Sequence, residues 1–252
     1  NADFIAAEDT RVSLKLLNHL GIKKSLVSYY EHNKAFKGDK IVERILAGET
    51  CALVSDAGSP AISDPGEDLV KQCAAAGIPV CAIPGPCAAI TALSISGQAT
   101  GRFCFEGFLS TSKKSRREHL ESLINEQRTM IFYEAPHKLL STLKDMNSVF
   151  GDRNIVVVKE LTKIHETSWR GTLSEAVKYH TENPPKGEYV LVLEGEQVEK
   201  EEMRDPMEEA ISIAKELMEK GKPASMAAKE AEKLTGQTKG EVYKRLMEEE
   251  NE

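Results

Sequence analysis

The sequence lacks the features that assign a chain quickly to the membrane or the secreted classes. In its 252 residues no apolar run reaches the ~20 residues that a membrane-spanning helix needs, and no apolar leader stands at the start. No membrane partner is therefore expected. The five cysteines are odd in number, lie mostly in apolar stretches and form no Cys-x-x-Cys pair, which favours a reducing cytoplasm over secretion.

Several ligand-binding signatures are also missing. His-Glu-x-x-His, paired cysteines and clustered His-carboxylate spacings do not occur, so no metal site is predicted. Gly-x-Gly-x-x-Gly and the P-loop motif are absent, which disfavours an ordinary Rossmann dehydrogenase and a P-loop NTPase. The 33 basic and 40 acidic residues give a net charge of −7, so a nucleic-acid partner would need a local basic face.

What is present is a pair of short apolar runs that each end in a loop of glycine, proline and small residues. Residues 51–55 and 78–83 have the continuity of strands buried in a parallel sheet, and the helical spacing between them ends at Gly77. This βαβ unit would place loops 56–60 and 84–87 at the carboxyl ends of neighbouring strands. Open α/β sheets bind ligands there.

The residue types in these loops limit what can bind. Gly58 and Gly85 allow close approach of the main chain, while Ser59 and Cys87 are small. Such a wall offers backbone polar groups but no nucleophile, and the helix after Pro86 begins with free N–H groups that suit an anion. A ligand that already carries an activated group to donate fits these loops better than a substrate that a side chain must activate. The alternative is a pair of tight connections without a ligand.

These loops carry a resemblance to a known family. VSDAGSPAISDPG and IPGPCAAITAL resemble the S-adenosylmethionine site of the tetrapyrrole methylase superfamily, in particular its ribosomal RNA branch. The segments AAEDTR, FEGFL, FYEAPHK, KELTKIHE, RGTL and GEYVLVLEG match in the same order, so the resemblance covers nearly the whole chain. It implies two α/β domains with a cleft between them, at residues 1–104 and 105–200, and a small helical appendage at residues 201–252.

The resemblance also implies an activity and a cofactor site. The activity is 2′-O-methylation of the ribose of a cytidine in the decoding region of 16S rRNA, as naked RNA or in the assembled 30S subunit, by a cytoplasmic homodimer. The cofactor-binding residues implied are Asp56, Gly58, Ser59, Pro60, Ile62, Pro84, Gly85, Cys87, Ala88, Tyr133, Glu134 and Glu188.

The sequence departs from the family at its beginning. The family opens with a strand and a Pro-Thr-Pro-Ile-Gly-Asn-like loop that forms one wall of the cofactor pocket, and neither is found here. Either those residues precede Asn1 in the protein, or the chain lacks them. In the second case cofactor affinity and activity would be reduced.

The activated methyl of S-adenosylmethionine leaves two tasks to the protein, which are placing the acceptor and removing its proton. Polar segments matched to the family supply four candidates. Arg11 and Lys159 are predicted to act in electrostatic placement, and Glu160 or Asp9 in proton acceptance. Ordinary salt bridges would also explain these pairs, and Asp9 would also serve as a helix N-cap.

Other elements follow from apolar periodicity. Strands are expected at residues 3–7, 26–30, 103–108, 129–133, 154–159 and 189–193, and helices at residues 10–20, 39–46, 86–95 and 136–149. Residues 109–117, LSTSKKSRR, contain no acidic residue, and Lys113, Lys114, Arg116 and Arg117 are predicted to form an RNA-binding loop. A solvated linker is the alternative.

The end of the chain differs in character, because residues 205–252 are charged, strand-free and typical of three helices. Their apolar stripes comprise Ile211, Ala214, Leu217 and Met218, then Ala227, Ala228, Ala231 and Leu234, then Val242, Tyr243 and Leu246. The segment resembles a helix-turn-helix-like tail, with Lys239, Lys244 and Arg245 as candidate RNA contacts. The acidic residues 248–250 leave open a packing or dimerisation role.

Two other functions remain alternatives. A tetrapyrrole or other small-molecule methylase would keep the donor and change the acceptor, but would not explain the basic segment or the tail. A non-catalytic RNA-binding protein is supported only by the missing first strand.

Overall fold

The computed structural model describes residues 1–197 and 205–249, and the chain divides into two compact units, Asn1–Glu196 and Gln197–Glu252. The predicted domain boundary between residues 200 and 201 lies outside the described residues. The predicted boundary between residues 104 and 105 falls inside the first unit and stays a prediction. None of the described helices combines the length and the apolar character that crossing a membrane requires.

The chain of the first unit begins with a three-stranded parallel sheet of order β2-β1-β3. Its strands are β1 (Phe4–Ala7), β2 (Ser25–Ser28) and β3 (Cys51–Val54), and its helices are α1 (Thr10–His19), α2 (Lys34–Leu46) and α3 (Glu67–Ala75). Leu17 of α1 packs against one face of this sheet, while Ile41 of α2 and Leu69 of α3 pack against the other. The helix predicted between residues 55 and 78 is thus confirmed as α3.

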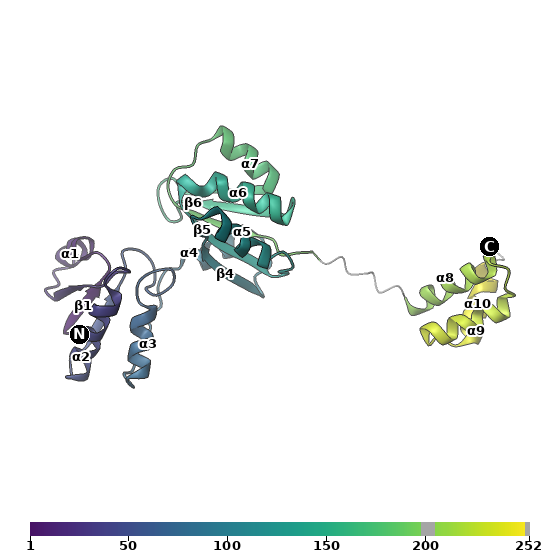
Figure 1. Cartoon of the computed structure of the whole chain (residues 1–252), viewed down its shortest axis with the longest axis horizontal. Helices are drawn as coiled ribbons and strands as arrows, with labels where there is room; N and C mark the ends of the chain where they lie inside the picture. Colours follow the sequence, from purple (N-terminus) through teal and green to yellow (C-terminus); the bar gives the residue numbers. More distant parts are fainter. Residues whose placement is uncertain (198–204, 250–252) are drawn as a thin grey trace. The chain divides into compact units, whose positions relative to one another are not determined.

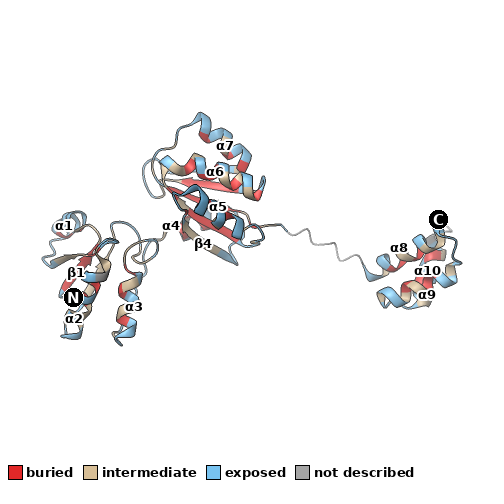
Figure 2. Ribbon diagram, viewed as in Figure 1, coloured by how far each residue is buried: buried red, intermediate tan, exposed pale blue. Residues whose placement is uncertain are grey.

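A five-stranded sheet of order β4-β5-β8-β6-β7 follows. Its strands β4, β5 and β6 are labelled in Figure 1. Its strands are β4 (Phe103–Phe108), β5 (Thr129–Glu134), β6 (Asn154–Lys159), β7 (Thr167–Thr172) and β8 (Tyr189–Leu193), and its helices are α4 (Ala88–Ser96), α5 (Lys113–Ser122), α6 (Pro136–Phe150) and α7 (Leu173–Glu182). Alternate residues along a strand point to opposite faces. Val157 and Leu191 therefore join the core under α5, α6 and α7, whereas Val156 and Val190 pack with α4 on the other face. Buried residues concentrate on these strands (Figure 2).

The second unit contains the three helices that the sequence predicts, α8 (Pro206–Glu219), α9 (Ala224–Thr235) and α10 (Lys239–Glu249). They enclose their own core around Ala210, Ala228 and Val242. Gly236 ends α9 in the left-handed conformation, as its place between two apolar stripes indicates. Leu234 does not belong to this core, because its side chain is 71% exposed.

One predicted strand is wrong. Residues 78–83 form no strand, and within them Val80 and Ile83 are 54% and 85% exposed. The segment connects α3 to α4, which packs on the five-stranded sheet, and among the described residues β3 pairs only with β1. A strand-like composition forms a strand only where a neighbour accepts its backbone hydrogen bonds.

The predicted basic loop is also wrong in part, because α5 begins at Lys113. Arg116 is buried on the inner face of this helix, where its Nη2 lies 2.7 Å from Asp145 Oδ2 and its Nη1 donates to the carbonyl of Ser110. A guanidinium held in this way is not available to RNA phosphates. β7 and α7 were not predicted, although the spacing of Thr172 and Glu175 is that of the capping box that begins α7.

The burial of Arg116 predicts a stability effect rather than a binding effect. Arg116→Ala should lower the free energy of unfolding by roughly 3 kcal/mol, because Asp145 would lose the partner of its partly buried charge. The exposed Lys113 is the matched control, and Lys113→Ala should change the same quantity by no more than ~0.5 kcal/mol. Chemical denaturation measures both, and equal effects of the two variants would contradict the role assigned to Arg116.

Candidate active site

A cavity of about 570 Å³ opens at one end of the five-stranded sheet, where β4, β5 and β6 end and β8 begins. This volume is within the usual range for small-molecule sites. Two loops close it from the side of the first sheet, residues 57–64 after β3 and residues 86–88 at the start of α4. The lining residues are Ala57, Gly58, Ser59, Ile62, Ser63, Asp64, Pro86, Cys87, Ala88, Thr91, Phe108, Tyr133, Glu134, Ala135, Pro136, Val158, Glu160, Leu161, Thr162, Lys163, Glu188, Tyr189 and Val190.

Main-chain contacts join the two loops. The Ser59 N–H donates to the carbonyl of Pro86 at 3.0 Å, and the Ser59 hydroxyl donates to the same oxygen at 3.2 Å. Gly58 has a φ of +77°, which an L side chain rarely adopts, and a Cβ there would lie 3.4 Å from the Pro86 carbonyl oxygen. The small residues predicted from the sequence are thus needed for the close approach of these loops.

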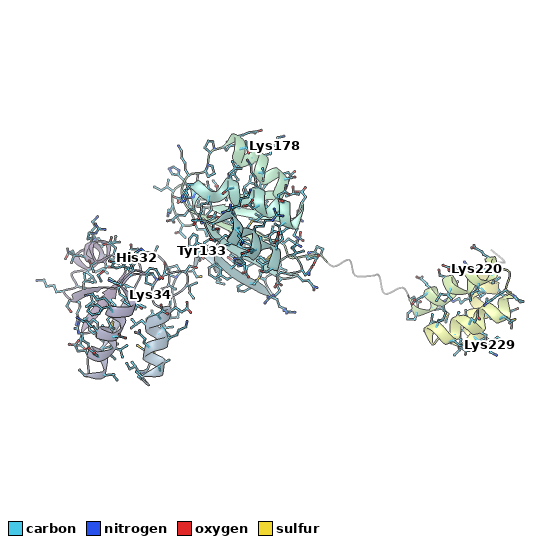
Figure 3. All side chains as sticks on the ribbon, viewed as in Figure 1. His32, Lys34, Tyr133, Lys178, Lys220 and Lys229 are labelled. Carbon is cyan, nitrogen blue, oxygen red and sulfur yellow. The ribbon has the colours of Figure 1, made fainter. Side chains whose placement is uncertain are left out.

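Helix α4 is attached to the five-stranded sheet at both of its ends. At its start the Ala89 N–H donates to the Tyr133 hydroxyl at 3.0 Å (Figure 3). At its end Arg170 of β7 donates to the carbonyls of Ile95, at 2.5 Å, and Ser96, at 3.4 Å. A cation near the last carbonyls of a helix is favourable because those carbonyls carry the negative end of the helix dipole. The cavity wall formed by the first turn of α4 is therefore fixed in place.

The opposite wall is a loop held by an ion-pair network. The ammonium of Lys163 lies 3.0 Å from Glu160 Oε1 and 2.8 Å from Glu188 Oε2, and so joins the loop after β6 to the residue before β8. The Glu188 N–H and Lys163 both donate to Glu160, and these bonds hold the pKa of its carboxyl below the usual range. Glu160 and Thr162 have positive φ values of 52° and 65°. Strained backbone of this kind concentrates at binding sites.

The loop after β3 places Asp64 in the cavity wall. Burial and the nearby charges of Glu8 and Asp56 raise the pKa of the Asp64 carboxyl from 3.8 to about 6. Two non-glycine residues of this loop, Ala61 and Ser63, also have positive φ. In the described part of the chain, no three His, Cys, Asp or Glu side chains group as a metal site would require.

The structure brings most of the predicted site residues together. Of the predicted cofactor-binding residues, the cavity is lined by Gly58, Ser59, Ile62, Cys87, Ala88, Tyr133, Glu134 and Glu188, together with the catalytic candidate Glu160. Asp56, Pro60, Pro84 and Gly85 lie outside the lining. Pro84 and Gly85 belong to the exposed connection before α4, although Gly85 lies against the cavity loop, since a Cβ there would lie 3.1 Å from Ser59 Oγ.

The catalytic candidates Asp9, Arg11 and Lys159 also lie outside the lining. Asp9 caps α1 through the Arg11 N–H, and its Oδ2 lies 2.6 Å from the Arg11 guanidinium. The side-chain hydrogen bond from Arg11 lowers the pKa of the Asp9 carboxyl to about 2. The pair still lies close to the cavity loops, because the Asp9 N–H donates to Asp56 Oδ1 at 3.3 Å. Their roles stay predictions.

Sequence reasoning missed several lining residues. Asp64 and Lys163 were not singled out, although both lie in segments matched to the family, Asp64 in VSDAGSPAISDPG and Lys163 in KELTKIHE. Membership of these segments is the one signal that could have found them. The apolar residues Phe108, Val158 and Val190 were assigned to strands, and nothing in a strand pattern shows which of its members border a cavity.

Comparisons with known proteins agree with this geometry. The profile of the family "Tetrapyrrole (Corrin/Porphyrin) Methylases" matches residues 1–177. A "Ribosomal RNA small subunit methyltransferase I" from Synechocystis sp. is 46% identical over 98% of this chain and 88% of its own length, and one from Halalkalibacterium halodurans is 52% identical over 80% and 71%. The crystal structure of the methyltransferase CobJ superposes with a TM-score of 0.58 at 15% identity, covering 77% of this chain and 83% of that one, which shows the fold alone.

The profile match covers most of the first unit, including loops 57–64 and 86–88 that form the cavity wall. The chain belongs to the tetrapyrrole (corrin/porphyrin) methylase family, and it is a methyltransferase whose methyl donor is S-adenosylmethionine.

Proposed function

We propose that the chain methylates the RNA of the small ribosomal subunit, and that its product is a 2′-O-methylated cytidine in the decoding region of 16S rRNA. The observation that carries the proposal is the extent of the likeness to the ribosomal RNA methyltransferases. The relative from Synechocystis sp. aligns over 98% of the chain, which includes the three-helix unit, whereas the family profile ends at residue 177. A tetrapyrrole methylase gives no reason for that additional unit.

The residues of the cavity fit S-adenosylmethionine. Asp64, Glu134, Glu160 and Glu188 contribute four carboxylates to the described lining, against the single ammonium of Lys163. Such a surface favours a ligand that carries positive charge, as the donor does on its sulfur and its amino group. The Tyr133 hydroxyl accepts from the Ala89 N–H, but Cys87 gives α4 no side-chain cap, so the other N–H groups of the first turn suit the carboxylate of the same ligand.

When bound, S-adenosylmethionine supplies a methyl group that its sulfonium already activates. The remaining work of the protein is placement and proton removal, and correct placement alone can contribute several kcal/mol to lowering the barrier. Gly58 and Ser59 would approach the donor with main chain, while Tyr133 fixes the helix start beside it. Asp9, Arg11, Lys159 and Glu160 are retained as proposed catalytic residues, with Arg11 and Lys159 acting in electrostatic placement.

Two exposed basic surfaces are proposed to contact RNA. On α5 these are Lys113, Lys114 and Arg117, although Lys114 lies 3.8 Å from Glu118 and Arg117 lies 2.7 Å from Glu121. On α10 they are the half-buried Lys239 and the exposed Lys244 and Arg245, and Lys244 lies 3.8 Å from Glu248. The exposed ion pairs on both surfaces are weak enough to open for phosphates. The homodimer implied by the resemblance stays a prediction.

The acceptor can be identified by isotope transfer. Labelled S-adenosylmethionine should transfer its methyl to 16S rRNA, offered naked or in assembled small subunits, and not to a porphyrinoid. The labelled cytidine should resist alkaline cleavage at its 3′ phosphate, because a 2′-O-methyl group removes the attacking hydroxyl. Label in the porphyrinoid would favour the tetrapyrrole alternative, and a labelled base would contradict ribose methylation.

Gly58 provides a test of the donor site. Gly58→Ala adds a methyl group at a φ of +77°, beside Pro86 and in the cavity wall, and should weaken S-adenosylmethionine binding severalfold. Gly21→Ala is the matched control, because Gly21 has a φ of +67°, lies outside the lining and has nothing within 4 Å of an added Cβ. Titration calorimetry gives both dissociation constants. Equal affinities of the two variants would show that the donor binds elsewhere.

Charge reversal tests the two basic surfaces. Changing Lys239, Lys244 and Arg245 to Glu, or Lys113, Lys114 and Arg117 to Glu, should weaken RNA binding and reduce its salt dependence by ~1 per lost phosphate contact, with donor affinity unchanged. Reversal of Lys220 and Lys229, which lie elsewhere in the three-helix unit (Figure 3), is the control. Unchanged RNA affinity in a variant removes that surface from the proposal.

A further inference from the structure

Three of the four carboxylates that line the cavity have basic or hydrogen-bonding partners. Glu160 and Glu188 share the ammonium of Lys163 at 3.0 Å and 2.8 Å. Glu134 is almost fully buried, and accepts from the Ala135 N–H at 2.8 Å and from the Thr142 hydroxyl at 2.5 Å, with Lys138 also close. Carboxylates held in this way are positioned for structure and binding.

Asp64 is the fourth lining carboxylate, and the charged groups that act on it are acidic rather than basic. The charges of Glu8, which follows β1, and of Asp56, which follows β3, act on Asp64, and the Asp56 N–H donates to Glu8 Oε2 at 3.2 Å. Tyr133 of β5 lines the same cavity as Asp64. Within the described residues no lysine, arginine or histidine pairs with Asp64. Its proton affinity is therefore raised, since burial and like charges both disfavour the ionised form.

The pKa values of the other two candidate proton acceptors are lowered rather than raised. The pKa of the Asp9 carboxyl is lowered to about 2, chiefly by the side-chain hydrogen bond from Arg11, and the N–H of Glu188 lowers the pKa of Glu160. A general base works best when its pKa lies near the working pH. Asp64, with a pKa raised to about 6, remains mostly ionised at neutral pH and binds a proton far more readily than either.

We propose that Asp64 is the general base of the methyl transfer and accepts the proton of the acceptor hydroxyl; this inference rests on the function proposed above. In the step the O–H bond of the acceptor breaks and its proton moves to the Asp64 carboxylate. The oxygen forms a bond to the methyl carbon as the bond between methyl and sulfur breaks, which leaves a neutral thioether. Protonated Asp64 then releases the proton to water.

The proposal predicts a separation of turnover from binding. Asp64→Asn keeps the shape of the side chain and removes its basicity, so kcat should fall by ~10²-fold or more, while the dissociation constant for S-adenosylmethionine should rise at most severalfold through the loss of one lining charge. Glu188→Gln is the matched control at a second lining carboxylate, and should change donor affinity more than kcat. Loss of donor affinity alone in Asp64→Asn would reassign Asp64 to cofactor binding.

The pH dependence gives a sharper readout. Wild-type kcat should rise with pH through about 6 and then level off, because only ionised Asp64 accepts the proton. Glu8→Gln should move this rise to lower pH and keep the plateau, since it removes one of the two charges that raise the pKa while still offering an acceptor to the Asp56 N–H. A rise that stays in place in Glu8→Gln would contradict the assignment.

A third readout does not use activity. Because the pKa of Asp64 is raised from 3.8 to about 6 by folding, this group favours the folded state below about pH 4, and that stabilisation is lost as the pH rises through 6. Asparagine does not ionise, so Asp64→Asn keeps the stability that the wild type loses when Asp64 ionises. The variant should therefore melt at a higher temperature than the wild type at pH 8 and at a similar temperature at pH 3.5. A lower melting temperature at pH 8 would show that Asp64 is an ordinary paired carboxylate.

The outcomes separate the two proposals. Wild-type protein that labels no RNA would overturn the proposed function, and the base with it. Wild-type protein that labels RNA, together with an Asp64→Asn variant of unchanged kcat and pH profile, would overturn the base alone.

Discussion

The hydrogen bond between the Ala89 N–H and the Tyr133 hydroxyl is the contact on which the site depends. It fixes the start of α4 against the five-stranded sheet, and the bond from Ser59 to the Pro86 carbonyl then joins the loop after β3 to the same point. Through these two bonds, the loop that follows β3 of one sheet and the start of α4 come to line a cavity at the end of the other sheet. Burial raises the pKa of the Tyr133 hydroxyl to about 12, so the tyrosine stays neutral and keeps this role at any physiological pH.

The electrostatics of the cavity suit the donor that is proposed to bind there. A cationic donor is favoured by a lining rich in carboxylates, and these carboxylates have different tasks because their partners differ. Glu160 and Glu188 hold the loop after β6 in place through Lys163. Asp64, in contrast, is influenced by the negative charges of Glu8 and Asp56. Residues of positive φ occur in the cavity loop after β3, at Ser63, and in the cavity loop after β6, at Thr162. The fold thus accepts local strain where it positions polar groups, as binding sites commonly do.

Much of the fold follows from local pattern. Strands β4, β6 and β8 were predicted to the residue, because β6 and β8 are rich in β-branched and other apolar residues and β4 contains three phenylalanines. The helices of the second unit follow from their apolar spacing. The strand predicted at residues 78–83 is wrong because their composition is typical of a strand, whereas the pairing that forms a strand depends on neighbours far away in sequence. The prediction that Arg116 contacts RNA fails for a related reason. A basic residue is expected on the surface, and only folding brings Asp145 beside Arg116 and allows its burial.

The candidate site was predicted in outline from its loops, since eight of the predicted cofactor-binding residues line the cavity, from Gly58 to Glu188. Asp64 could not be distinguished from a turn residue, because its properties come from Glu8 and Asp56, which precede it by many residues. The most direct measurement of the whole account is a crystal structure of the protein with S-adenosylhomocysteine. The account predicts the ligand in the cavity, against Gly58, Ser59 and the first turn of α4. A ligand bound at any other surface would contradict it.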